Sequence, residues 1–145
     1  AFPFYNSQNS QVYSLVHCTS NREGFKLYKK SAWKVFGDQS STKKTHGEDG
    51  QFVLNLDPNV GSVVTTSTDK SCFTVHDITK YLQKSFSGRK GVHIEEMWAL
   101  LDEHPIFPSS YRNQIKQELI EMYGATKEQV VDPLTGKKET VISFR

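Results

Sequence analysis

The chain has 145 residues, of which 36% are hydrophobic, 12% aromatic and 23% charged, an ordinary composition for a globular protein. Its length fits one domain, or two very small ones that share a core. No apolar run approaches the roughly 18 residues that a membrane-spanning helix needs. No charged and then apolar leader resembles a signal peptide, so we expect no membrane contact.

The charge of the chain gives no overall sign of a nucleic-acid binder. The net charge is +2, with eight Lys and Arg against six Asp and Glu in residues 1–70, and ten against ten in residues 71–145. An argument for phosphate binding must therefore depend on where the basic residues lie. Cys18 and Cys72 are too few for a disulfide scaffold. We expect two reduced, buried thiols in a cytoplasmic protein, with a single bridge as the alternative.

The N-terminal half predicts a strand followed by an amphipathic helix. Residues 12–18 are β-branched and aromatic and favour a buried strand. Ser20 and Glu23 have the spacing of a capping box, which predicts a helix over residues 21–36 that ends at Gly37. A strand that leads directly into such a helix is half of an α/β unit.

The predicted helix has an apolar face and a basic face. The apolar arc is expected to face a core and holds Phe25, Tyr28, Ala32 and Phe36. The adjoining arc holds Arg22, Lys26, Lys29, Lys30 and Lys34, with Trp33 among them. Lys26, Lys30 and Lys34 are therefore candidate phosphate contacts, and Trp33 is a candidate stacking residue. The alternative is a solvated face, with Trp33 packed against the middle of the chain.

The middle of the chain predicts little regular structure. Residues 37–50 are polar and rich in Gly and Ser, which indicates an exposed loop. Short strands are predicted over residues 51–56 and 62–67, with a turn at residues 57–59 between them.

The remainder of the chain predicts two helices joined by a short extended segment. A cap formed by Thr74 and Asp77 begins the first helix, which ends by Gly88. Residues 91–93 are extended, and the second helix stops at His104, which precedes a proline. The apolar positions that would pack these two helices are Val75, Ile78, Leu82, Phe86, Ile94, Met97, Trp98 and Leu101.

A third helix and a hairpin complete the chain. Pro108 suits the first turn of a helix over residues 108–123, which closes at Gly124. The predicted buried stripe of this helix consists of Tyr111, Ile115, Leu119 and Met122. Residues 130–131 and 140–144 flank a segment rich in turn residues, which predicts a β-hairpin.

The order of these elements defines the predicted fold class. Helix, short strand, helix, turn, helix and hairpin follow one another as in a winged helix-turn-helix domain, and a bare three-helix bundle would not explain the hairpin. We therefore predict an α+β protein with a winged helix-turn-helix C-terminal domain in residues 72–145. A strand–helix, α/β-like unit with a loop-rich middle precedes it in residues 1–71.

Two stretches resemble the C-terminal region of the three-Cys-motif partner proteins. Residues 13–19, followed by residues 24–35, are similar to a strand that ends in a small residue and Thr, then a Gly, a Lys-rich helix and an Ala-x-Trp ending. Residues 92–119 look like the winged-helix-like segment of that family. The resemblance implies the last α/β element of a methyltransferase-like domain and a prokaryotic, cytoplasmic conflict system. It also implies an upstream domain of the same protein, and the start at Ala1 without Met likewise leads us to expect a fragment.

The candidate binding residues follow from the winged-helix order, because the third helix of such a domain commonly enters the DNA major groove. Near the start of that helix lie Ser109, Ser110, Arg112, Asn113 and Lys116. Arg can bind guanine bidentately, Asn can pair with adenine, and Ser suits phosphate. Further phosphate contacts are predicted from Lys137 and Lys138 at the hairpin tip, and from Arg89 and Lys90 before the second helix. The acidic residues of the second helix would repel DNA if they faced it.

No catalytic residue, cofactor or metal site is predicted. His17 and Cys18 are neighbours on a predicted strand, so their side chains point to opposite faces and cannot join Cys72 and His76 around one zinc ion. Neither Cys has a catalytic context, and the glycines lack the spacing of a phosphate-binding loop. Whether the whole protein is an enzyme stays open.

The sequence therefore predicts a nucleic-acid-binding module, with duplex DNA as its partner, in a larger prokaryotic defence-type protein. One alternative is a protein-interaction module, whose signature would be an exposed apolar patch at Trp33, Phe107 or Tyr111. Another is the non-catalytic tail of a methyltransferase-like or nuclease-like enzyme.

Overall fold

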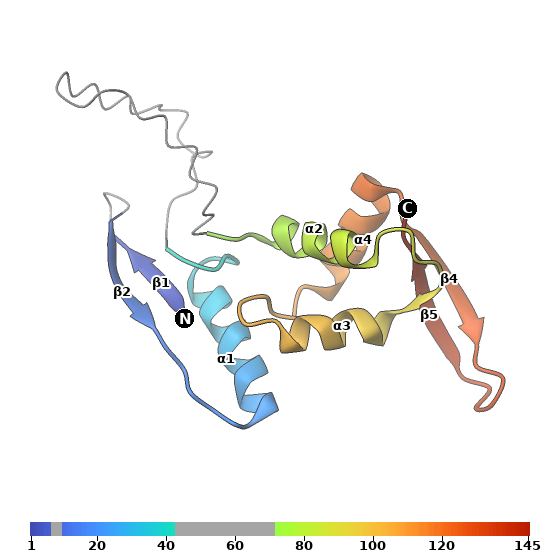
Figure 1. Cartoon of the computed structure of the whole chain (residues 1–145), viewed down its shortest axis with the longest axis horizontal. Coiled ribbons are helices and arrows are strands. Elements are labelled where there is room, and N and C mark those ends of the chain that lie inside the picture. Colours follow the sequence, from blue (N-terminus) through green and yellow to red (C-terminus); the bar gives the residue numbers. More distant parts are fainter. Residues whose placement is uncertain (7–9, 43–71) are drawn as a thin grey trace, which may run out of the picture.

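The computed structural model describes residues 1–6, 10–42 and 72–145 (Figure 1). Within these residues the chain forms four helices and two small antiparallel sheets, which confirms a mixed α+β class. The strands predicted over residues 51–56 and 62–67, and the loop from residue 43 onward, lie outside the described part. Among the described helices, none has the length and apolar character that crossing a membrane requires.

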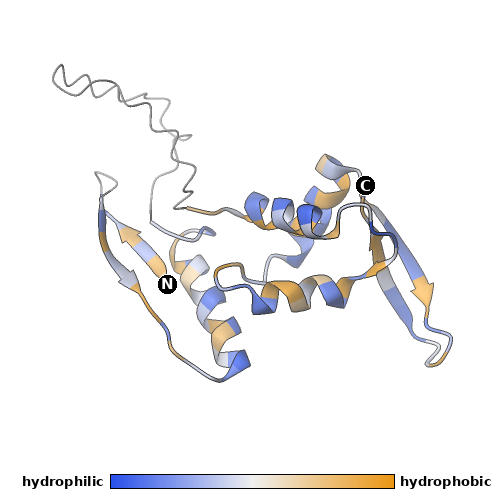
Figure 2. Cartoon of the chain, viewed as in Figure 1, coloured by the Kyte–Doolittle hydropathy of each residue, from blue (hydrophilic) through white to orange (hydrophobic). Residues whose placement is uncertain are grey.

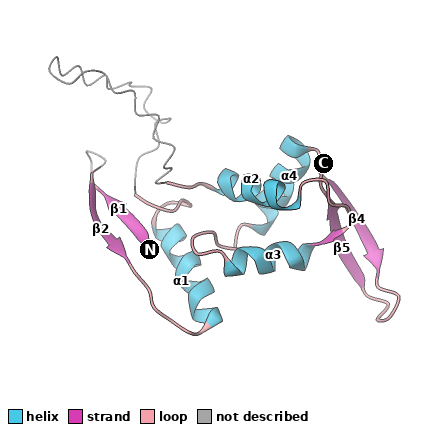
Figure 3. Cartoon of the chain, in the orientation of Figure 1, coloured by secondary structure: helices cyan, strands magenta, loops and turns pink. Residues whose placement is uncertain are grey.

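The elements lie in three groups along the molecule (Figures 1 and 3). The first hairpin and α1 are at one end, the other three helices are in the middle, and the second hairpin is at the far end. In chain order the elements are β1 Phe2–Tyr5, β2 Gln11–Leu15, α1 Arg22–Val35, α2 Val75–Phe86, β3 Val92–His93, α3 Ile94–Glu103, α4 Arg112–Tyr123, β4 Thr126–Val131 and β5 Lys138–Ser143.

The N-terminal unit is an antiparallel hairpin packed on a helix. Strands β1 and β2 pair with Phe2 opposite Leu15. Rings of β1 contact α1, since the Phe2 centroid lies 5.3 Å from that of Tyr28 and the Phe4 centroid lies 4.7 Å from that of Phe36. The apolar face predicted for α1 is confirmed: Ala32 and Phe36 are buried, and Phe25 and Tyr28 are half-buried.

The prediction of a buried strand over residues 12–18 was wrong. Strand β2 ends at Leu15, all of its residues are exposed, and its partner is the unpredicted β1 rather than a parallel neighbour. The N-terminal unit is therefore an antiparallel hairpin with a helix, and not half of a parallel α/β unit. Cys18 is an exposed free thiol, so the expectation of two buried thiols holds only for Cys72, which is also free.

Of the two N-terminal helix caps predicted from the sequence, the cap of α2 is confirmed and that of α1 is wrong. At α1 the cap is Asn21, whose Oδ1 accepts hydrogen bonds from the N–H groups of Glu23 and Gly24, so the proposed Ser20 capping box was wrong. At α2 the predicted cap is confirmed, because the Asp77 carboxylate accepts the Thr74 N–H at 2.8 Å.

Helix α4 ends at Tyr123 with Gly124 as its cap, as predicted, but its start and one residue of its buried stripe differ from the prediction. It begins at Arg112 rather than at residue 108. Ile115 and Leu119 are fully buried as predicted, whereas Met122 is 60% exposed. The chain turns at Gly124, with φ of +65°, and Ala125 beyond it is buried instead. The predicted stripe assumed helical spacing throughout, so it did not include a buried residue that follows the turn.

The C-terminal hairpin is paired as predicted. Strand β5 lies between β3 and β4 in a three-stranded antiparallel sheet. Val141 and Ile142 of β5 are buried, while every residue of β4 is exposed. Figure 2 shows that the end of β4 is nevertheless hydrophobic. One cluster of buried side chains extends from Phe2 to Phe144 and includes residues of α1, α2, α3 and α4.

A buried lysine joins α1 to the end of α3. The side chain of Lys29 is fully buried, and its Nζ donates to the backbone carbonyls of Leu101 (2.7 Å), Asp102 (3.0 Å), His104 (2.8 Å) and Phe107 (3.0 Å). An ammonium has three N–H groups, so at least two of these oxygens share one proton. The negative end of the α3 dipole also favours a cation there. Burial lowers the pKa of Lys29 to about 8, and the Asp102 carboxylate opposes this shift.

Trp33 makes a second polar contact one turn further along α1. Its indole Nε1 donates to the Ile106 carbonyl at 3.0 Å, and its ring is fully buried against Phe107 and Tyr111. The prediction that Lys29 and Trp33 belong to a basic outer face was therefore wrong. The polar atoms of both side chains bind main-chain carbonyls, which residue types alone do not reveal.

Replacing Lys29 with Met leaves the four carbonyls without their shared donor. We expect Lys29→Met to lower the free energy of unfolding by about 3–5 kcal/mol, because breaking a buried charged contact leaves its partners desolvated. Urea denaturation measures this change. The matched control is Lys30→Met, an exposed site on the same helix, with an expected change within about 0.5 kcal/mol. Equal stability of the two variants would contradict this account of the contact.

Candidate nucleic-acid interface

The turn between α3 and α4 fixes where the candidate binding helix starts. Nδ1 of His104 accepts the N–H groups of Ile106 (3.2 Å) and Phe107 (3.0 Å), and its ring stacks on Phe107 with centroids 4.1 Å apart. Pro108 is buried within the turn. These contacts hold residues 104–111 out of helical geometry, which explains why α4 does not begin at Pro108.

Protonation of His104 would disrupt this turn. Burial, together with the nearby Lys29 ammonium, lowers its pKa from 6.5 to about 4. The ring is therefore neutral near pH 7, with Nδ1 free of a proton and able to accept both backbone N–H groups.

Arg112, at the start of α4, has a side chain that makes two contacts with the protein. Its side chain is exposed, its Nε donates to the Ser109 carbonyl at 3.3 Å, and its guanidinium lies 5.3 Å from the centroid of the buried Trp98 ring. Stacking on an aromatic face limits the rotamers of an Arg while its remaining N–H groups stay open to a ligand.

The other candidates, on α4 or just before it, divide into two groups. Asn113 and Ser110 are exposed, and Lys116 is half-buried. Ser109 is directed into the protein, because its hydroxyl donates to Asp102 Oδ1 at 2.6 Å. Ser109 is therefore already used by the fold.

Two glutamines on α4 were missed by the sequence reasoning. Gln114 and Gln117 are exposed; Gln114 is next to Asn113, and Gln117 lies one helical turn after Asn113. Their amides donate to Glu118 at 3.1 Å and to Glu121 at 2.9 Å. The sequence could have identified them, because the helix face opposite Ile115 and Leu119 carries mainly amide side chains rather than cations.

The remaining basic candidates differ in availability. Lys137, Lys138 and Lys90 are exposed. Arg89 binds Glu96 at 2.8 Å, so much of its charge is compensated locally.

The lysines of α1 do not join the same surface as the hairpin. Lys26 contacts Glu23 at 3.0 Å and Asp102 at 3.3 Å, and these two carboxylates raise its pKa. Lys30 and Lys34 are exposed, but α1 and the β4–β5 hairpin lie at opposite ends of the molecule (Figure 1). The start of α4 is closer to α1, since Tyr111 donates to Asp38 at 2.7 Å.

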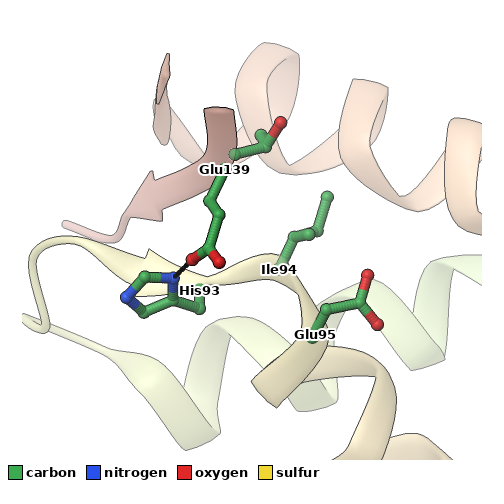
Figure 4. Close-up of a pocket in the computed structure, with 5 residues that line it drawn as sticks. His93, Ile94, Glu95 and Glu139 are labelled. Atoms are coloured by element: carbon green, nitrogen blue, oxygen red, sulfur yellow. Dashed lines mark ion pairs between the residues drawn. The ribbon is translucent and has the colours of Figure 1, made fainter. Parts of the chain in front are cut away.

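An acidic pocket limits where an anionic partner could lie. The pocket has a volume of about 440 Å³ and is lined by His93, Ile94, Glu95, Glu139 and Thr140 (Figure 4). His93 and Glu139 point toward each other, with an ion pair of 2.8 Å, and Glu95 projects from the start of α3. Carboxylates repel phosphate, so a DNA surface would involve α4 and the hairpin tip rather than this pocket.

Comparisons and metal-binding geometry add no further assignment. No family model, curated protein or solved structure matches this chain. In the part of the chain that the structure describes, no group of three or more His, Cys, Asp and Glu side chains is arranged to hold a metal ion.

Because His104 stays neutral in the folded chain, the free energy of unfolding depends on pH in the acid range. Between about pH 4 and pH 6.5 the unfolded chain binds a proton at this ring and the folded chain does not, so the free energy of unfolding falls as the pH is lowered through this interval. In His104→Asn an amide oxygen can accept the same N–H groups without titrating. We expect the variant to lose less stability, by about 2 kcal/mol, in urea denaturation across that interval. Parallel stability curves for the two proteins would contradict the proposed role of the ring.

Proposed function

We propose that this chain is a DNA-binding module of the winged helix-turn-helix type. The order α2, β3, α3, α4, β4 and β5 supports the proposal, as does the pairing of the short β3 with β5. In this arrangement α4 is the recognition helix and the β4–β5 hairpin is the wing.

The observation that carries the proposal is the orientation of α4. Ile115 and Leu119 are fully buried, and Arg112 and Asn113 in the first turn are exposed. Helix α4 can thus present a guanidinium and an amide, the two groups that read guanine and adenine in the major groove, without losing a core contact. The exposed amides of Gln114 and Gln117 extend this polar face.

The charge balance favours a binder that makes few phosphate contacts. Residues 71–145 contain as many acidic as basic side chains, and Glu118 and Glu121 lie on α4 itself. With Lys116, Lys137 and Lys138 as phosphate ligands, we expect a plot of the logarithm of the binding constant against the logarithm of the salt concentration to have a slope of about −3.

We further propose that the module belongs to a larger protein. The resemblance of residues 13–35 and 92–119 to the three-Cys-motif partner proteins supports a methyltransferase-like domain upstream and a prokaryotic, cytoplasmic setting. Under this proposal the present chain contributes binding or substrate positioning, and any chemistry belongs to the upstream domain.

A protein-interaction module is the second candidate, and exposed apolar side chains favour it. The patch predicted at Trp33, Phe107 or Tyr111 is not formed, because Trp33 and Phe107 are buried in the core and Tyr111 is half-buried. Other exposed apolar side chains lie on α4 and the hairpin: Ile120 (41%), Met122 (60%), Val130 (44%), Val131 (55%) and Leu134 (94%).

Removing the two cations of α4 tests DNA binding directly. We expect Arg112→Ala combined with Lys116→Ala to weaken binding to a mixed-sequence duplex by about tenfold or more, and to reduce the magnitude of the salt slope by about one, because only Lys116 binds phosphate. Fluorescence anisotropy over a salt series measures both quantities.

The matched control removes two lysines from α2. The combination Lys80→Ala and Lys84→Ala makes the same change in charge at exposed positions of the helix that packs behind α4. Its effect on affinity and salt slope should be much smaller. Binding that responds equally to both double variants would indicate a general charge effect and would remove α4 as the recognition helix.

A further inference from the structure

Strand β2 is an exposed edge of the N-terminal hairpin. Within the part of the chain that the structure describes, β1 is the single strand that pairs with β2. Figure 1 shows β2 at the outer side of the molecule. Every residue of β2 is exposed, and so is Val16, which follows it. The main-chain N–H and C=O groups along such an edge can pair with a strand of another chain.

The edge of β2 lacks the charges that normally discourage such pairing. Open edge strands commonly carry Lys or other charged side chains, which keep a second strand away. Strand β4, at the edge of the second sheet, follows this pattern with Lys127 and Glu128. Residues 1–21, by contrast, contain no Lys, Arg, Asp or Glu. The edge of β2 therefore does not repel a second copy of itself, and it has no charge that would attract DNA.

The sequence of this edge is self-complementary about Ser14. In an antiparallel pair of two β2 strands with Ser14 opposite Ser14, Tyr13 lies opposite Leu15 of the second copy. Val12 lies opposite Val16 in the same way. These four side chains are 42–66% exposed in the single chain. Each of them thus gains an apolar partner, and cross-strand apolar pairs of this kind stabilise a sheet.

The pairing of β2 with β1 suits a second strand at this position. The register is regular from the pair Phe2–Leu15 to the pair Phe4–Tyr13 and shifts only beyond Phe4, so the regular part of β2 is centred on Ser14. Pro3 lies opposite Ser14 and has no N–H, so it cannot donate to the Ser14 carbonyl. A strand on the other side of β2 can supply that hydrogen bond.

We propose that β2 is a dimerisation strand. Two copies of the chain pair antiparallel along β2, centred on Ser14, and their hairpins join into one four-stranded sheet. Residues directly opposite each other project to the same face, so both α1 helices lie on one side of this sheet. The contact is symmetric and therefore closes at two copies. The inference is independent of the proposed DNA-binding function.

Sedimentation equilibrium of the full chain tests the dimer. The contact uses one strand of each copy, so we expect a monomer–dimer equilibrium in the micromolar range. Ser14→Lys should weaken dimerisation by about tenfold or more, because two ammonium groups then meet at the symmetry axis. The matched control is Gln129→Lys, the same change in charge at an exposed residue of the edge strand β4. It should leave the equilibrium unchanged.

Cross-linking tests the register. The proposed pairing brings the two Ser14 Cα atoms to about 5.5 Å, a separation that a disulfide spans. In a Cys18→Ser background, Ser14→Cys should therefore form a covalent dimer on mild oxidation, whereas Gln129→Cys should not.

Three results would overturn the proposal. The first is a wild-type chain that stays monomeric throughout the micromolar range. The second is a dimer that Ser14→Lys does not weaken, or that both lysine variants weaken equally. The third is a series of species larger than a dimer, because a symmetric β2 contact cannot extend beyond two copies.

Discussion

The structure depends on one buried ammonium group. Lys29 brings a positive charge to the last turn of α3, where it binds the main-chain carbonyls of Asp102 and of Leu101, which also accepts the His104 N–H. Burying a charge is costly unless it is paired or fully hydrogen-bonded, and four carbonyl oxygens meet that condition. The same contact satisfies the end of α3 and ties the N-terminal unit to the helices. A polar contact within the apolar core thus joins α1 to the end of α3 and the turn that follows it.

The attachment has a consequence for the candidate binding helix. Lys29 and Trp33 bind the turn from one side, and His104 binds it from within. The turn leads directly into α4, so the direction of α4 and the position of Arg112 are set before any partner arrives. A binding surface that is already ordered loses less conformational entropy on association. The turn of the β4–β5 hairpin is also held by hydrogen bonds, such as the one from the Leu134 N–H to the Asp132 carboxylate.

The sequence predicted the C-terminal half much better than the N-terminal half, for physical reasons. The Thr74 cap, the stripe through Ile115 and Leu119, and the turn residues of the hairpin are local signals. The exposure of β2 depends on pairing with β1, and the burial of Lys29 depends on carbonyls more than 70 residues away. A lysine on a helix is normally predicted to be solvent-exposed. The spacing of apolar residues along the helix contains no information about main-chain acceptors that are distant in sequence. For the candidate site the sequence predicted the exposure of Arg112 and Asn113 but not that Ser109 and Lys26 bind Asp102.

The central claim is that α1 and the helices that follow form one cooperative unit through the turn between α3 and α4. Native-state hydrogen exchange measures it most directly, because it reports the opening free energy of each amide. The account predicts that amides near Trp33 in α1 and near Ile115 in α4 exchange with the same free energy, equal to that of global unfolding. Amides of α1 that open at a much lower free energy, while those of α4 remain protected, would contradict it.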